Sequence, residues 1–191
     1  MNRAIKIGVS SCLLGEKVRY DGGHKQDRYI TDLLGNFFSF LPVCPEVGCG
    51  LPTPREAMHL EGDPASPRLV TVRSRVDMTG QMLAYCASKV QELEGEDLCG
   101  FIFKKNSPSS GLFRVKVYQG GMPSKSGSGL FAAAVTRHYP QLPVEEEGRL
   151  NDPVIRENFI ERVFSYRRWK DFLLDKPDLG RLVEFHSRQK L

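Results

Sequence analysis

Short strand-like stretches alternate with helical stretches along the first 150 of the 191 residues. The strand-like stretches are rich in β-branched and aromatic residues, and they are residues 4–9, 40–43, 68–73, 99–103 and 114–118. Helices are expected between them, at residues 27–34, 77–93 and 130–139. This alternation predicts an α/β fold of three layers, in which a mostly parallel sheet is flanked by helices.

The loops that follow three of these strands carry polar and sulfur-containing residues. They begin at Ser10, Cys44 and Lys104. Because ligands of parallel sheets bind beyond the carboxyl ends of the strands, we expect these loops to converge on one site. The glycine- and serine-rich residues 120–129 are expected to form a loop that leads into the next helix. A loop before a helix N-terminus is a natural anion site, but the signal is weak here because the lysine of a P-loop is missing.

The character of the chain changes from Asn151 onward. An Asn-Asp-Pro start and apolar residues at helical spacing predict a long amphipathic helix, which Pro177 interrupts before a second helix. We therefore divide the chain into an α/β unit, residues 1–150, and a helical C-terminal extension, residues 151–191.

Charge and hydropathy indicate which cellular compartment and which classes of partner to expect for this chain. The formal net charge is only +4 and the basic residues are scattered, so no nucleic-acid partner is expected. No apolar run approaches the length of a membrane span, and residues 1–12 do not resemble a signal peptide. We expect a cytoplasmic protein without a membrane partner, in which the five cysteines are thiols rather than disulfides.

The cysteines fall into two groups. Cys86 lies on the apolar stripe of a helix and Cys99 opens a strand, so both are interpreted as small buried hydrophobic residues. Cys12 and Cys44 instead follow strand ends and face the expected site. Two thiolates in one pocket are soft ligands, suited to zinc or iron–sulfur chemistry. Because no CxxC pair or closely spaced histidine is present, the spacings argue against a zinc knuckle and favour a site assembled from separate loops.

Three stretches carry a family resemblance. SSCLLGEKVRYDGG (residues 10–23), CPEVGCGLPTPRE (44–56) and KKNSPSSG (104–111) resemble, in this order and spacing, the thiouracil desulfidase (TudS) family. The resemblance covers roughly residues 4–150, and residues 151–191 are similar to the truncated start of a YbgA-type helical domain. It implies a [4Fe-4S] cluster held by three cysteines, and hydrolytic, non-redox desulfuration of thiouracil or a thiouridine nucleotide.

Carried over position by position, the resemblance makes Cys12 and Cys44 cluster ligands and Glu46 and Ser107 catalytic residues. The third ligand position falls at Ser110. A hydroxyl is a harder ligand than a thiolate and keeps its proton at neutral pH, so it should hold iron less well. The serine can reflect an introduced cysteine-to-serine change, a natural oxygen ligand, or loss of the cluster. Cys49 is an alternative third ligand.

The residue types fit this chemistry on their own. Glu46 lies two residues after Cys44 and can activate water, while Ser107 can move a proton or hold a pyrimidine. The plainer alternatives are that Glu46 caps a turn and that Ser107 bonds its own backbone. Candidate substrate-binding residues are Arg19, Asp21, His24, Lys25, Arg55 and Lys104. Asp21, which precedes two glycines, is equally typical of a plain turn.

The sequence therefore predicts an iron–sulfur desulfidase, weakened or inactivated by Ser110, whose partner is a thiolated pyrimidine or its nucleotide. Two other functions stay open. One is a nucleotide-binding module that lacks the cluster, and the other is a mononuclear zinc hydrolase that uses Cys12, Cys44 and Glu46. The oligomeric state is not predicted.

Overall fold

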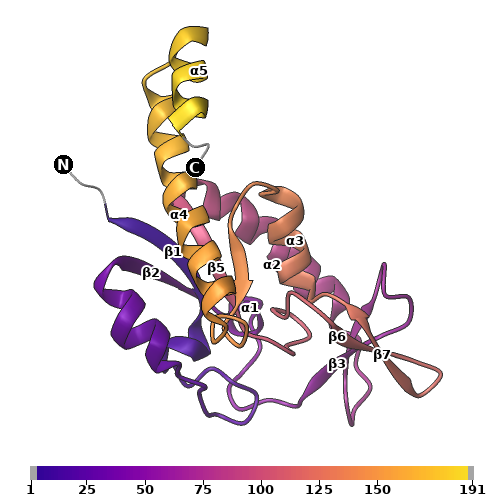
Figure 1. Ribbon diagram of the computed structural model, residues 1–191. Helices are drawn as coiled ribbons and strands as arrows, with labels where there is room; N and C mark the ends of the chain where they lie inside the picture. Colours follow the sequence, from indigo (N-terminus) through magenta and orange to yellow (C-terminus); the bar gives the residue numbers. More distant parts are fainter. Residues whose placement is uncertain (1–3, 189–191) are drawn as a thin grey trace.

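The structure is a computed structural model that describes residues 4–188, in which eight strands form two four-stranded sheets (Figure 1). The first sheet has the order β2-β1-β5-β8, and all of its neighbouring strands are parallel. Its strands are β1 (Ile5–Ser10), β2 (Phe38–Val43), β5 (Leu98–Phe103) and β8 (Val144–Glu146). The predicted α/β class with a mostly parallel sheet is confirmed.

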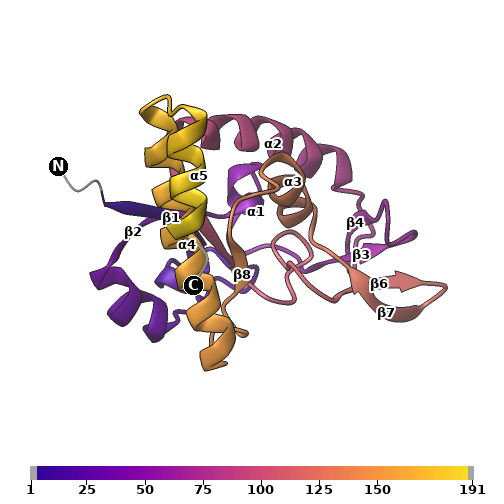
Figure 2. The ribbon, with the colours of Figure 1, turned by 45° about the horizontal axis from the view of Figure 1, so that its top comes forward.

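The second sheet is smaller and mixed. Its order is β4-β3-β6-β7, with two antiparallel pairs joined by the parallel pair β3 and β6. Its strands are β3 (Met58–Glu61), β4 (Arg68–Thr71), β6 (Val115–Gln119) and β7 (Met122–Gly127). Figure 2 shows β6 and β7 extending away from the first sheet.

Helices cover both faces of the first sheet. They are α1 (Pro45–Gly48), α2 (Thr79–Glu92), α3 (Leu130–His138), α4 (Pro153–Leu174) and α5 (Leu179–Arg188), with short turns at Ser11–Leu14, Tyr29–Leu33, Leu34–Asn36 and Leu93–Glu96. From Phe101 to Phe103, successive side chains of β5 point to opposite faces. Phe101 and Phe103 stack in the core beneath α2 and α3, whereas Ile102 joins a second core cluster with residues of α4. Cys99 also joins this second cluster, because the pairing of β1 with β5 is irregular between Leu98 and Gly100.

The predicted apolar stripe of α2 is confirmed, because Met82, Cys86 and Val90 are buried. The side chain of Asp77 accepts a hydrogen bond from the Thr79 backbone N–H at 2.8 Å, which satisfies one of the free donors at the start of this helix.

Two expectations about the strands are wrong. Residues 68–73 and 114–118 do not extend the parallel sheet, because β4 and β6 belong to the second sheet. Residues 120–129 are not an open loop either, since β7 pairs antiparallel with β6. Gly120 and Gly121 both have positive φ angles, 58° and 87°, and this backbone conformation closes a two-residue hairpin turn. Strand β8, which was not predicted, completes the edge of the parallel sheet.

The C-terminal extension is helical, as expected. The Asp152 side chain accepts hydrogen bonds from Val154 N and Ile155 N, which fixes the start of α4. Phe159 and Val163 pack into the core, and α5 folds back so that the Phe172 and Phe185 rings stack 4.5 Å apart. The division at residue 150 and the YbgA-type assignment stay predictions.

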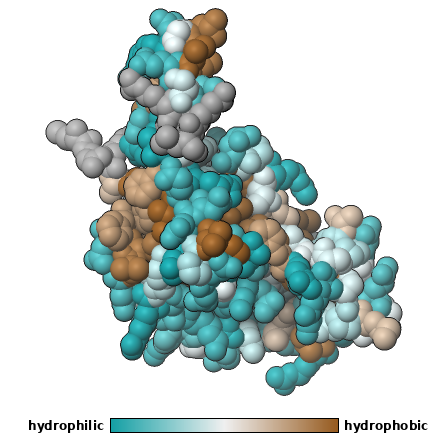
Figure 3. Space-filling model, in the orientation of Figure 1, coloured by the Kyte–Doolittle hydropathy of each residue, from teal (hydrophilic) through white to brown (hydrophobic). Residues whose placement is uncertain are grey.

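The hairpin formed by α4 and α5 projects from the body of the molecule, and apolar side chains gather at its outer end (Figure 3). The exposed residues there are Leu173, Leu174, Leu179, Leu182 and Val183. Within residues 4–188, no helix combines the length and apolar character needed to cross a membrane.

Candidate active site

The three polar loops converge on one cavity of about 390 Å³. It lies beyond the carboxyl ends of β1, β2 and β5, and residues 10–12, 43–46 and 104–108 all contribute to its wall. This volume falls in the range of small-molecule sites. The predicted convergence of these loops is confirmed.

Most residues predicted for the site line this cavity. They are Cys12, Arg19, Lys25, Cys44, Glu46, Arg55, Lys104, Ser107 and Ser110. Asp21 and His24 are not among its lining residues. The Asp21 side chain accepts a hydrogen bond from Gly23 N at 3.0 Å, as in the turn alternative, and His24 Nδ1 accepts one from Gln26 N. The structure therefore places both outside the cavity.

The two cavity thiols are held at the starts of short helical turns. Cys12 is the second residue of the turn that follows β1 and is 9% exposed, while Cys44 precedes α1, whose first residue is Pro45. Burial raises the pKa of Cys12 to about 11. Burial, with the nearby negative charge of Glu46, raises the pKa of Cys44 to about 12. Both side chains are therefore neutral thiols at neutral pH.

The third ligand position carries a buried hydroxyl. Ser110 is 3% exposed, and its backbone N–H donates to Ser107 Oγ at 3.1 Å. Cys49, the alternative third ligand, is not among the lining residues of the cavity; its side chain packs against the core cluster and its thiol donates to the Glu46 carbonyl oxygen at 3.2 Å. Among residues 4–188, no group of three His, Cys, Asp or Glu side chains could hold a metal ion.

Glu46 belongs to a short polar network rather than to a turn cap. Its Oε1 accepts a hydrogen bond from Ser109 Oγ at 2.5 Å, and the Cys44 thiol donates to its Oε2 at 3.4 Å. Ser109 Oγ also lies 3.0 Å from Ser107 Oγ. The carboxylate is thus linked to both a candidate ligand and the candidate serine.

Ser107 both bonds the backbone of its own loop and lines the cavity. Its Oγ accepts hydrogen bonds from Ser109 N and Ser110 N, which is the backbone role expected before a proline. It also lines the cavity. Sequence reasoning missed Ser109, although its position two residues after Ser107 in the same loop was a usable signal.

Basic side chains form another part of the cavity wall. Lys104 pairs with Glu147, a residue that sequence reasoning also missed. The Nε atom of Arg55 is buried and has no hydrogen-bond partner among residues 4–188, whereas Arg19 Nε lies 3.4 Å from Asp21 Oδ1 in an ion pair. Since an unpaired buried donor is costly, the Arg55 N–H group favours an acceptor bound in the cavity. The arrangement suits an anionic or oxygen-rich ligand.

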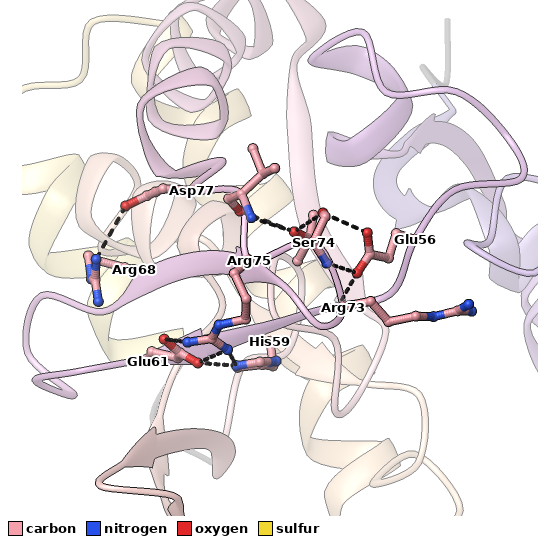
Figure 4. Close-up of polar contacts among 10 residues, drawn as sticks. Glu56, His59, Glu61, Arg68, Arg73, Ser74, Arg75 and Asp77 are labelled. Carbon is pink, nitrogen blue, oxygen red and sulfur yellow. Dashed lines mark hydrogen bonds and ion pairs between the residues drawn. The ribbon is translucent and has the colours of Figure 1, made fainter.

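A separate polar cluster lies on the second sheet (Figure 4). Glu61 accepts hydrogen bonds from the Arg75 guanidinium and lies 2.5 Å from His59 Nε2. Nearer the cavity wall, Glu56 accepts hydrogen bonds from Ser74 N and Ser74 Oγ at 2.9 and 2.7 Å. These contacts stabilise the hairpin of β3 and β4. They also pair His59 with Glu61 on the second sheet, and His59 is not a lining residue of the cavity.

Comparisons with known proteins match this region of the chain. The sequence model of the 2-thiouracil desulfurase family matches residues 7–147. The uncharacterized protein YbbK of Bacillus subtilis (strain 168) is 31% identical over 153 residues, which cover 76% of this chain and 98% of the relative. The solved structure of a [4Fe-4S]-dependent thiouracil desulfidase, TudS, is similar with a TM-score of 0.62 and 32% identity, over 77% of this chain and 93% of that one.

Proposed function

This chain belongs to the 2-thiouracil desulfurase family, and we propose that it hydrolyses the thiocarbonyl of thiouracil or of a thiouridine nucleotide. In this reaction water adds its oxygen to the ring carbon, the carbon–sulfur bond breaks, and the sulfur leaves as sulfide. No net oxidation or reduction occurs. The observation that carries the proposal is the meeting of Cys12, Cys44 and Glu46 in one cavity from two separate loops.

The residues at the three expected ligand positions differ from the three cysteines that the resemblance implies. The solved neighbour is [4Fe-4S]-dependent, and the resemblance implies three cysteine ligands. Here the three positions supply two thiols and the hydroxyl of Ser110, so the donor set is one thiolate short. Because iron–sulfur iron prefers thiolates, this set does not match the expected one. We propose that Ser110 weakens cluster binding and keeps the activity of this chain low.

Glu46 is the proposed general base. Ser109 fixes one of its oxygens and the Cys44 thiol contacts the other, so the carboxylate is held at the cavity wall. A positioned carboxylate can take a proton from water as the oxygen attacks. Ser107 and Ser109 provide a hydroxyl pair through which a proton can move or to which a pyrimidine oxygen can bind.

The basic wall supports a nucleotide as the substrate form. Arg55 presents a buried Nε–H without a hydrogen-bond partner among the described residues, and Arg19 and Lys25 line the same cavity. Guanidinium groups bind phosphate through paired N–H donors. A thiouridine monophosphate would place its phosphate against these groups. Neither the zinc hydrolase nor the cluster-free binding module gains support from the residues that the structure describes.

Turnover measurements test the proposal. We expect sulfide release from thiouracil, thiouridine or thiouridine monophosphate under anaerobic conditions, with a low rate in this chain and a higher rate in Ser110→Cys. Glu46→Gln in that background should lower kcat by roughly 10²-fold or more, because the amide cannot accept the proton. Glu94→Gln, a change in an ion pair away from the cavity, is the matched control. Absence of sulfide from all three substrates in both backgrounds would overturn the proposal.

A further inference from the structure

The loop after β5, residues 104–113, carries Ser107, Ser109 and Ser110, and its two ends are held by neighbouring carboxylates. These carboxylates belong to Glu146 and Glu147, at the end of β8. The pairing of β8 with β5 places Glu146 opposite Phe103, the last residue before the loop. Both acids therefore emerge beside the loop at the carboxyl edge of the sheet.

Glu146 holds the C-terminal end of the loop through the backbone. It is 5% exposed, and its Oε1 accepts hydrogen bonds from Leu112 N at 2.8 Å and Phe113 N at 3.1 Å. Within the described part of the chain, no cation forms an ion pair with Glu146. A buried carboxylate is costly unless it is hydrogen-bonded, so these two N–H groups are the contacts that account for its position.

Glu147 holds the N-terminal end of the same loop. Its Oε2 accepts a hydrogen bond from Lys105 N at 2.8 Å, and its Oε1 pairs with the ammonium of Lys104. The Lys104 backbone N–H is also tied to Ser10 Oγ at 3.0 Å. The start of the loop is thus fastened to both β1 and β8.

The segment between these two ends is closely packed. Gly111 N donates to the Ser107 carbonyl at 2.8 Å, and Ser109 Oγ reaches Glu46. We infer that Glu146 and Glu147 are positioning residues, which fix both ends of the loop so that Ser109 contacts both Glu46 and Ser107. This inference rests on the proposed function, because it assigns the two acids a part in that reaction.

Amide hydrogen exchange tests the loop contacts without any need for activity. In Glu146→Ala, exchange of the peptide that spans residues 104–113 should rise by about tenfold or more, while peptides from β1 and α2 stay unchanged. Glu146→Gln should restore protection, since its amide oxygen can still accept both backbone N–H groups. Glu61→Ala removes a hydrogen-bonded carboxylate from the second sheet and should leave the loop peptide unchanged.

Kinetics in the Ser110→Cys background test the positioning. Glu146→Ala should lower kcat by at least about tenfold with a smaller change in KM, because displaced groups still allow binding. Glu146→Gln should restore kcat, and Glu147→Gln, which keeps an acceptor for Lys105 N but loses the charge beside Lys104, should fall between the two.

Several results would overturn the inference. They are an unchanged loop peptide in Glu146→Ala, faster exchange throughout the protein, Gln as harmful as Ala, or faster loop exchange with kcat intact. If no variant, Ser110→Cys included, releases sulfide, the proposed function fails. The exchange experiment then still decides whether these acids hold the loop.

Discussion

The two cavity thiols are much weaker acids than free cysteine. Burial raises the pKa of Cys12 to about 11 and that of Cys44 to about 12, whereas a free thiol titrates near pH 8.5. At pH 8 the thiolate fraction of Cys12 is on the order of a thousandth, so its reaction with an alkylating reagent should be slow.

Alkylation by iodoacetamide should therefore be slow at pH 7–8 for Cys12 and Cys44 and should accelerate as the pH rises beyond 9. The rates can be followed by mass spectrometry of the Cys12 and Cys44 peptides, and a small free thiol provides the control. Labelling of Cys12 at pH 7.5 as fast as the free thiol would show that its site is not the buried one described above.

Glu61 provides a second prediction at the residue scale (Figure 4). Hydrogen bonds from Arg75 and His59 lower the pKa of Glu61 to about 2, from 4.5 in the unfolded chain. A lowered pKa means that the unfolded state binds the proton more tightly. The stabilising contribution is therefore fully present above pH 4.5 and is lost as the pH falls toward 2.

Glu61→Gln should accordingly lose stability relative to the parent chain near neutral pH, and the difference should shrink between pH 4.5 and 2. Urea unfolding across pH 2–7 measures this difference in the free energy of unfolding. A difference that stays constant over the whole range would mean that the Glu61 charge has no part in stability.

At the scale of elements, β-branched runs and helix signals identified most strands and helices, but not their grouping into sheets. Strand β7 contains glycine, proline and two serines, so its sequence favours a loop, and only the pairing with β6 makes it a strand. Strand β8 has three residues, too few for a periodic signal. Glu146 at its end and Glu147 directly after it hold the Ser107 loop, so the contacts of that loop were missed together with the strand.

Helix α4 allows a direct test of how far the core extends past residue 150. Phe159 is 2% exposed and packs in the core cluster with Ile7 and Ile102, so Phe159→Ala should cost about 3–5 kcal/mol in the free energy of unfolding. Val154→Ala, at a 76% exposed position of the same helix, should change it by no more than about 0.5 kcal/mol. Equal effects of the two changes would show that α4 is not part of the core.

At the scale of the whole molecule, parallel topology predicted the meeting of loops that are far apart in the chain. The positions of Cys12, Cys44 and Glu46 followed from strand ends and from the family resemblance. The contacts of Ser109, Glu146 and Glu147 did not, because hydrogen bonds between distant loops leave no local pattern in a single sequence.

The central claim is that this chain is a desulfidase whose cluster site lacks one thiolate, at Ser110. The most direct test is anaerobic reconstitution of the parent chain and Ser110→Cys with iron and sulfide, followed by measurement of bound iron and of sulfide released from thiouracil and thiouridine monophosphate. We predict that Ser110→Cys binds iron more tightly, shows stronger thiolate-to-iron absorption and turns over at least about tenfold faster. Equal iron content and equal turnover in the two proteins would contradict the account.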